Sequence, residues 1–282
     1  MNKIKNLALP YIIWAVIMLL LPMLLLVLYS FTESGNGIVT FSFTLKYFVK
    51  FFTDPDFLLI LWRSLKIAFK TTVICVLLGY PVAYFIANSS DEARDMLVLL
   101  VTLPMLINTL VRTYAWIGIL SDGGLAQTLL SKLGLGTPKL LYTEGAVLLG
   151  MVYNFVPFMI LQINSSLTKM DKSLLEASSD LGANGVQTFL KVTLPLSIPG
   201  VVSGISLVFL PAVSSFSIPK FLGGGQYFLI GNVIENQFIT VGEWNFGSAI
   251  SMIMAVTMMA TMYLIRKIDA GNGTADSGQP VK

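Results

Sequence analysis

The chain has 282 residues, of which 55% are hydrophobic and 12% charged, whereas ordinary soluble domains contain about 25% charged residues. Its apolar residues come in long blocks, which favours a membrane protein. A net charge of +3 without a basic stripe argues against a nucleic-acid-binding protein, and the absence of histidine together with a single cysteine, Cys75, argues against disulfide frameworks, metal sites and Ser-His chemistry.

Six apolar segments are each long enough, at about 20 residues, to cross a hydrocarbon layer of about 30 Å as an α-helix. The sequence therefore predicts an all-α, polytopic membrane protein with six transmembrane helices in residues 1–270, and a disordered polar tail at 271–282. The spans are expected at residues 7–31, 67–87, 96–120, 146–167, 198–216 and 247–265.

The first segment follows Lys3 and Lys5 and is too long for the apolar region of a cleaved signal peptide, about 7–15 residues, so a retained anchor is expected. The aromatic-rich stretch 32–66 that follows is predicted to be an external loop along the outer membrane interface. The distribution of positive charges favours cytoplasmic N- and C-termini.

Proline and glycine interrupt most of the predicted spans. An interior proline frees a carbonyl and kinks a helix, which lipid tolerates where protein or a wet cavity satisfies the backbone. The residues indicate either ordinary kinks in packed helices or a bundle that lines a pathway. They are Pro22, Gly79, Pro81, Pro104, Pro157, Pro199, Gly204 and Pro211.

The predicted cytoplasmic loop between the fourth and fifth spans, at about 169–196, contains the most informative pattern. Asp171 or Ser173 is expected to open a short helix, Gly182 to break it, and Pro195 to stop a second short helix before the next span. A plain amphipathic loop on the inner leaflet would not require this spacing.

The loop resembles the EAA signature of ABC importer permeases, in which EAA is followed by three residues, Gly, nine residues and Ile-x-Leu-Pro. Glu176, Ala177, Gly182, Leu194 and Pro195 match, while Ser178 replaces the second alanine and Val192 the isoleucine. The resemblance implies that the loop couples to a separate ATPase subunit dimer.

The same resemblance implies a second homologous permease subunit, an extracellular substrate-binding protein, and a location in the bacterial cytoplasmic membrane. The chain contains no GxxxxGK[ST] phosphate loop, so no ATP hydrolysis and no cofactor of its own are expected, and ATP with Mg²⁺ would bind the partner ATPase.

Residues 110–116, 174–183 and 229–234 resemble the polyamine (spermidine/putrescine) branch of these permeases. Permeases for ferric iron, sulfate or other solutes share much of the scaffold and remain alternatives. An ion-coupled carrier would need intramembrane Asp, Glu or His, and a membrane enzyme would need a nucleophile–base pair or metal cluster; the predicted spans offer none of these.

Candidate residues for the translocation path are one deep cation and a set of aromatic and hydroxyl side chains. Arg112 is either a pathway residue or a structural charge bonded to helix carbonyls or a partner subunit, and in the path it would suit an anion better than a polyamine. The other candidates are aromatic residues, which at such spacing are more often packing residues, and two serines that could line a polar vestibule: Tyr114, Trp116, Tyr153, Phe158, Phe209, Phe216, Ser214 and Ser215.

Overall fold

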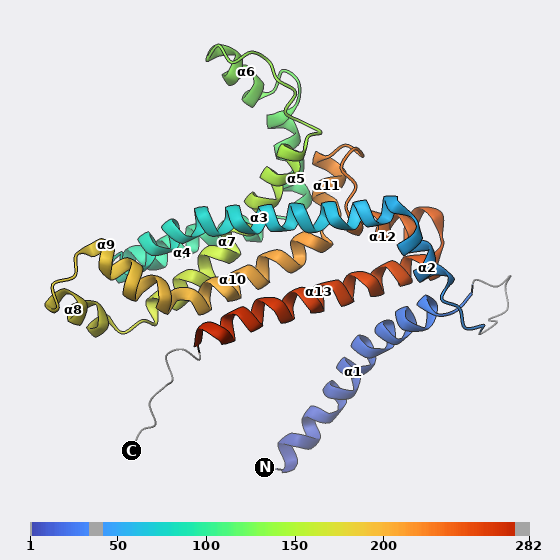
Figure 1. Ribbon diagram of the computed structural model, residues 1–282, viewed down its shortest axis with the longest axis horizontal. Coiled ribbons are helices and arrows are strands. Elements are labelled where there is room, and N and C mark those ends of the chain that lie inside the picture. The colour runs from blue at the N-terminus through green and yellow to red at the C-terminus, as the bar shows by residue number, and fades with distance from the viewer. Residues whose placement is uncertain (1, 34–41, 274–282) are drawn as a thin grey trace. The chain divides into compact units, whose positions relative to one another are not determined.

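Helices form the regular secondary structure of the residues that the computed structural model describes, 2–33 and 42–273 (Figure 1). The expected all-α fold is confirmed. In chain order the helices are α1 (Asn2–Ser30), α2 (Lys46–Thr53), α3 (Pro55–Ala87), α4 (Asp91–Leu106), α5 (Thr109–Leu120), α6 (Leu125–Lys132), α7 (Glu144–Thr168), α8 (Lys172–Asp180), α9 (Gly185–Thr188), the π-turn η1 (Phe189–Thr193), α10 (Leu194–Ser214), α11 (Ser217–Leu222), α12 (Ile230–Asn236), the π-turn η2 (Gln237–Val241) and α13 (Trp244–Gly273).

Four of the described helices are long and apolar enough to cross a membrane: α3, α7, the continuous stretch Gly185–Ser214, and Trp244–Lys267 of α13. The bent pair formed by α4 and the helices after it provides a fifth crossing if it is one span, and α1 contributes a shorter apolar stretch, Trp14–Ser30. The count of six spans therefore stays a prediction. Residues 274–282 of the predicted tail lie outside the described residues.

The prediction of one continuous helix at residues 96–120 is wrong. The chain breaks at Ile107 and Asn108, and the two halves meet at 88°. Pro104 cannot donate a backbone hydrogen bond, and the Asn108 side chain accepts one from the Leu110 N–H at 2.8 Å, which starts a new helix. The Asn108 side chain therefore stabilises the start of α5 at a position where α4 could otherwise continue.

Helix α3 begins 12 residues before the predicted second span, so much of the expected external loop is helical. Pro55 is its first residue, where the fixed φ of proline suits a helix and the missing N–H costs nothing. The Asp54 carboxylate accepts a hydrogen bond from the Asp56 N–H at 3.0 Å and caps the new helix. The extra turns carry α3 beyond the length that one hydrocarbon layer requires.

The chain divides into two compact units: Met1–Leu61 with Ile230–Met259, and Trp62–Leu229 with Ala260–Lys282. In the first unit an aromatic cluster forms the core. Phe51 and Phe246 are fully buried, Phe57 meets Phe246 edge-on at 5.1 Å between ring centroids, and Lys50 lies 4.3 Å above the Phe246 ring. The aromatics expected on an interfacial loop are therefore partly core residues, because α2 turns them to one side.

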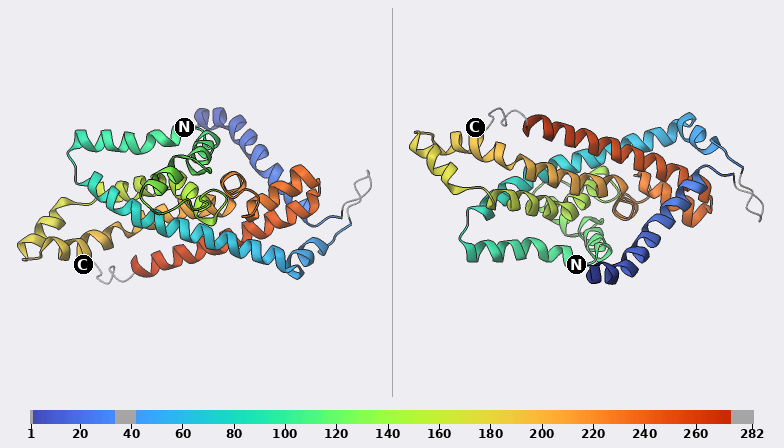
Figure 2. Two further views of the ribbon diagram at one scale, coloured as in Figure 1. Left: turned by 90° about the horizontal axis from the view of Figure 1, so that it is seen from above. Right: turned by 90° about the horizontal axis from the view of Figure 1, so that it is seen from below.

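In the second unit, α7 is the central helix. It packs against α10, α4, α5 and α11, and half of its most apolar stretch is buried, the largest share among the candidate spans (Figure 2). Its closest neighbour is α10, where Gly200 and Gly204 face α7: a Cβ atom at Gly200 would lie 2.4 Å from Ser166 Cβ. This Gly-x-x-x-Gly pattern lets the two backbones approach closely, as in other membrane helix pairs.

An ion pair joins α3 and α7 at the N-terminal end of α7, between Lys70 and Glu144. Glu144 also interacts electrostatically with Arg63 and Lys66, so a single carboxylate lies near three cations. Glu144→Gln is expected to lower the stability of the detergent-solubilised protein by about 1 kcal/mol, because the pair is half exposed. Thermal unfolding of Glu144→Gln, Lys70→Gln and the double variant measures this effect. The loss of stability in the double variant should be smaller than the sum of the losses in the two single variants. Strictly additive losses would show that the ion pair contributes nothing.

Candidate functional site

The candidate site is the hairpin formed by α8 and α9, which lies beyond one end of α7 and α10 in all three views (Figures 1 and 2). Helix α8 ends at a glycine in the left-handed conformation: Gly182 has φ +81°. Its N–H donates to the Ser179 carbonyl at 2.9 Å, and the Ala183 N–H donates to the Ser178 carbonyl at 3.1 Å. This Schellman motif satisfies the last carbonyls of α8 and makes the expected break at Gly182 a defined turn.

The second arm of the hairpin begins with a capping box. The Asn184 side chain accepts a hydrogen bond from the Gln187 N–H at 2.9 Å, and the Gln187 side chain accepts one from the Asn184 N–H at 3.0 Å. The two arms are joined where the Ser178 and Thr188 hydroxyls lie 2.8 Å apart. Ser178, which replaces alanine in the signature, therefore links the arms, and the hairpin is held by its own hydrogen bonds.

Pro195 does not stop a helix, and that prediction is wrong. The chain runs without a break from α9 through the π-turn Phe189–Thr193 into α10, and Pro195 is the second residue of α10. A proline in a regular helix clashes with the carbonyl four residues earlier. The wider π-turn just before Pro195 relieves this conflict, so the hairpin is continuous with the α10 span.

Two tyrosines of α3 hold the root of the hairpin. Tyr80 and Tyr84 meet the Phe189 ring edge-on, at 5.8 and 5.4 Å between centroids, and the Tyr80 hydroxyl lies 2.7 Å from that of Ser197 on α10. Edge-to-face aromatic contacts have a preferred geometry and resist sliding. The root of the hairpin is therefore in direct contact with α3 and continuous with α10.

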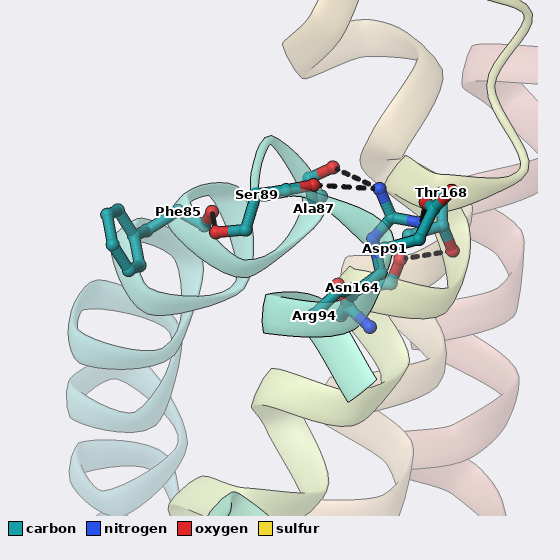
Figure 3. A network of polar contacts seen from close by, with 7 residues as sticks. All are labelled: Phe85, Ala87, Ser89, Asp91, Arg94, Asn164 and Thr168. Atoms are coloured by element: carbon teal, nitrogen blue, oxygen red, sulfur yellow. Dashed lines mark hydrogen bonds and ion pairs between the residues drawn. The ribbon is translucent and has the colours of Figure 1, made fainter. Parts of the chain in front are cut away.

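A cavity of about 240 Å³ separates the hairpin from the turn between α3 and α4. Arg94 lines it and clamps that turn: its guanidinium donates to the carbonyls of Ala87 and Ser89 at 3.3 and 3.1 Å and pairs with Asp91 at 2.8 Å (Figure 3). The α3–α4 turn is thus fixed, whereas the hairpin has space beneath it.

Three large apolar side chains of the hairpin and of the π-turn at its root are exposed among polar residues. Leu181 at the tip is 89% exposed, and Val186 and Leu190 are 67% and 54% exposed. Glu176 and Ala177 are also exposed on α8, and Glu176 forms no ion pair with any residue that the structure describes. Exposed large apolar side chains next to polar residues are typical of a protein–protein contact.

The seven predicted coupling residues fall into two groups in the structure. Glu176, Ala177, Ser178 and Gly182 form the head of the hairpin, while Val192, Leu194 and Pro195 form its root at the π-turn and the first turn of α10. Tyr80, Tyr84 and Phe189 belong to the same site but were not predicted. The Asn184–Gln187 spacing is a signal that the sequence contained, whereas the aromatic contacts depend on how α3 packs.

Asp171 caps the first helix of the hairpin, as expected, by accepting a hydrogen bond from the Ser173 N–H at 3.0 Å. Hydrogen bonds from the Ser173 backbone and side chain hold the pKa of Asp171 below its usual value. The pKa of Asp171 is lower in the folded protein than in the unfolded chain. The ionised carboxylate therefore stabilises the fold above the usual carboxyl pKa, and this contribution to stability is lost as the pH falls through the lowered pKa.

Asp171→Ala is therefore expected to speed hydrogen–deuterium exchange of the first turn of α8 several-fold, and Asp171→Asn to leave it near wild type, because asparagine caps equally well. Exchange of residues 172–176 in the two variants measures this. Equal exchange in Asp171→Ala and Asp171→Asn would contradict a capping role.

The structure brings some of the predicted path residues together. Trp116 and Tyr153 meet edge-on at 5.4 Å between centroids and line an apolar groove of about 480 Å³, whereas Tyr114 packs on Phe221 at 5.2 Å. The Ser214 hydroxyl donates to the Leu210 carbonyl at 3.2 Å. The remaining predicted residues do not line this groove: Phe158 is half-buried on α7, Phe209 is buried on α10, Ser215 follows the end of α10, and Phe216 is exposed.

Arg112 lies in the first turns of α5, next to the break in the bent span. Its Nη2 donates to the Thr109 hydroxyl at 3.2 Å, while Nε and Nη1 are buried without a partner among the described residues. An arginine with two unpaired donors in a membrane segment requires an acceptor. As for metals, the described residues contain no group of three or more His, Cys, Asp or Glu side chains close enough to hold an ion.

The sequence matches known families and proteins over most of its length. The family described as "Binding-protein-dependent transport system inner membrane component" matches residues 76–270. The chain is 38% identical over 267 residues to the spermidine/putrescine transport system permease protein PotB of Haemophilus influenzae, with 93% of each chain covered. It is 38% identical over 248 residues to PotB of Escherichia coli K12, covering 87% of this chain and 90% of that one.

Solved structures share the fold. The chain superposes on a chain of a bacterial ABC transporter involved in the import of the acidic polysaccharide alginate with a TM-score of 0.74, at 19% identity, covering 94% of both chains. It superposes on a chain of the MetNI methionine ABC transporter with a TM-score of 0.54, at 17% identity, covering 77% of this chain and 94% of the other.

Proposed function

Since the chain belongs to the family of binding-protein-dependent transport system inner membrane components, we propose that its α8–α9 hairpin is the element through which ATP hydrolysis on another subunit drives transport. The chain itself is the permease subunit of an ABC importer, a multi-pass membrane protein and a transport component rather than an enzyme.

The observation that carries the coupling role is the exposure of three large apolar side chains on the hairpin and the π-turn at its root. Leu181, Val186 and Leu190 would be covered by a groove on the ATPase subunit, and Glu176 would face a positive group at its rim. Movement of the ATPase would tilt the hairpin into the cavity beneath it. Because the hairpin is continuous with α10 and gripped by Tyr80 and Tyr84, the tilt would reach α10 and α3.

The proposed assembly contains a second homologous permease, two ATPase subunits that bind ATP and Mg²⁺, and an extracellular substrate-binding protein. A related importer of the same fold is known in complex with a periplasmic protein carrying its ligand, alginate pentasaccharide. Alternating access would follow from rocking of the two bundles around a shared path. Both termini of this chain would lie in the cytoplasm, with the hairpin on the same side.

A polyamine is the proposed cargo, because the PotB relatives at 38% identity are spermidine/putrescine permeases and the similarity covers most of both chains. The edge-on pair Trp116 and Tyr153 offers aromatic faces that attract ammonium groups. The Arg112 guanidinium is turned inward in this chain, so it need not oppose a cation in the path. Carboxylates that pair with the cargo would come from the second permease.

Uptake by the complete importer in proteoliposomes tests both parts of this proposal. Labelled spermidine should enter only when the binding protein outside and ATP at the ATPase subunits are both supplied. Transport of ferric iron or sulfate without spermidine would overturn the cargo and leave the permease role intact. Spermidine entry without the ATPase subunits would overturn the coupling role of the hairpin.

A further inference from the structure

A long apolar groove runs along the middle of α3, and one charged residue, Lys66, lines it near its Trp62 end. The groove has a volume of about 740 Å³ and is lined by α3, by Ile205 and Phe209 of α10, and by Thr261 and Ile265 of α13. On α3 it extends from Trp62 to Leu77, about 22 Å along a helix axis. That length exceeds the hydrocarbon of one leaflet, which is about 15 Å, half of about 30 Å.

The outer end of the groove carries the chemistry of a membrane interface. Trp62 is 66% exposed there, and tryptophan is enriched at the headgroup level of membranes. Lys66 lines the groove, and Arg63 and Lys70 lie three residues before and four after it, on the same side of the helix. These three cations reach one carboxylate, Glu144, which pairs with Lys70.

Lys66 is the charged residue that lines the groove, and Arg63, one turn before it, lies beside the groove without lining it. Lys70 is paired with Glu144, so Arg63 and Lys66 together exceed the acid that reaches them, while the rest of the lining is mostly apolar. A purely apolar transmembrane helix from a partner would cover the walls but would not neutralise the cations. A phospholipid supplies both parts, since its acyl chain is apolar and its phosphate is an anion at the interface. We propose that the groove is a binding site for an anionic phospholipid of the outer leaflet, with the headgroup on Arg63 and Lys66 and one acyl chain along α3 between α10 and α13.

The complete importer, purified from membranes into detergent and analysed by native mass spectrometry, tests the site. The wild type should retain phosphatidylglycerol in preference to phosphatidylethanolamine, and the double variant Arg63→Gln/Lys66→Gln should retain about tenfold less of it. Lys132→Gln, which removes one exposed charge at the end of α6, is the matched control and should retain the wild-type amount. Equal retention in the wild type and the double variant would overturn the proposal.

A second measurement separates the lipid from a protein occupant. A benzoylphenylalanine photocrosslinker at Val73, which lines the groove and is 39% exposed, should form an adduct with phospholipid in nanodiscs. The same group at Leu99 on α4, which is exposed outside the groove, controls for random lipid contact and should label less. Adducts of Val73 with a permease subunit instead of lipid would overturn the proposal, as would equal labelling at the two positions. None of these outcomes depends on the identity of the cargo.

Discussion

A tryptophan in place of Gly182 is expected to reduce ATP-driven uptake at least tenfold, while the permease remains folded and in the membrane. A Cβ atom at this position would meet nothing within 4 Å in the chain, so the indole would project outward from the hairpin tip beside Leu181. The positive φ costs a non-glycine residue about 1–2 kcal/mol locally. Losing a central contact at an interface costs about 2 kcal/mol or more, and 1.4 kcal/mol is a factor of ten.

Gly134 provides a matched control for this substitution. It ends α6 in the same Schellman geometry: φ is +75°, its N–H donates to the Ser131 carbonyl, the Leu135 N–H donates to that of Leu130, and a Cβ atom there would also meet nothing within 4 Å. Gly134→Trp therefore carries the same backbone strain outside the hairpin and should transport at a rate close to wild type. The amount of ATPase subunit that co-purifies, and the rate of ATP hydrolysis in the presence of binding protein, should fall in Gly182→Trp but not in Gly134→Trp. Equal effects of the two substitutions would mean that strain, and not docking, is responsible.

Charge reversal at Glu176 tests the polar part of the same contact. Glu176→Lys leaves the intrachain contacts of the hairpin unchanged, since the carboxylate is exposed and forms no ion pair with a described residue. It should weaken binding of the ATPase subunits, and the loss should shrink at high salt because rim charges are screened. Glu176→Gln should bind the ATPase subunits with an affinity between those of the wild type and Glu176→Lys. A Glu176→Lys importer with wild-type hydrolysis and uptake would remove Glu176 from the contact.

Gly200→Ala is expected to destabilise the bundle by about 1–3 kcal/mol, with a matching loss of folded protein in the membrane. The new Cβ would lie 2.4 Å from Ser166 Cβ and 3.0 Å from the Gln162 carbonyl on α7, and backbone cannot move aside at low cost. Gly204→Ala should cost less, because its Cβ would meet the flexible end of Met159 at 2.5 Å.

Gly118→Ala is the control for these glycines. It lies inside α5, and its Cβ would meet nothing within 4 Å, so alanine should be neutral or stabilising by about 0.5–1 kcal/mol. Thermal unfolding in detergent, measured as the loss of the monodisperse complex, ranks the stability of the three variants. Similar stability of Gly200→Ala and Gly118→Ala would show that α7 and α10 are not in close contact at this position.

The amino-acid sequence by itself determined the features that depend on local order. Long apolar blocks specify helices that cross a membrane, because every backbone group in lipid must be satisfied within its own segment. The offsets from Glu176 to Gly182 and on to Leu194 and Pro195 identified the hairpin, and Asp171 and Gly182 begin and end its first helix for reasons of cap chemistry that act within a few residues.

The tertiary structure alone decided how these elements meet. The break at Asn108, the π-turn before Pro195 and the grip of Tyr80 and Tyr84 on Phe189 depend on which helix faces are in contact. In spans that are apolar on all sides, hydrophobic periodicity does not mark the packed face. The shapes of the helix surfaces therefore determine which faces pack together. Gly200 and Gly204 allow α7 to approach because they lack side chains, and no local sequence pattern reveals this fit between segments far apart in the chain.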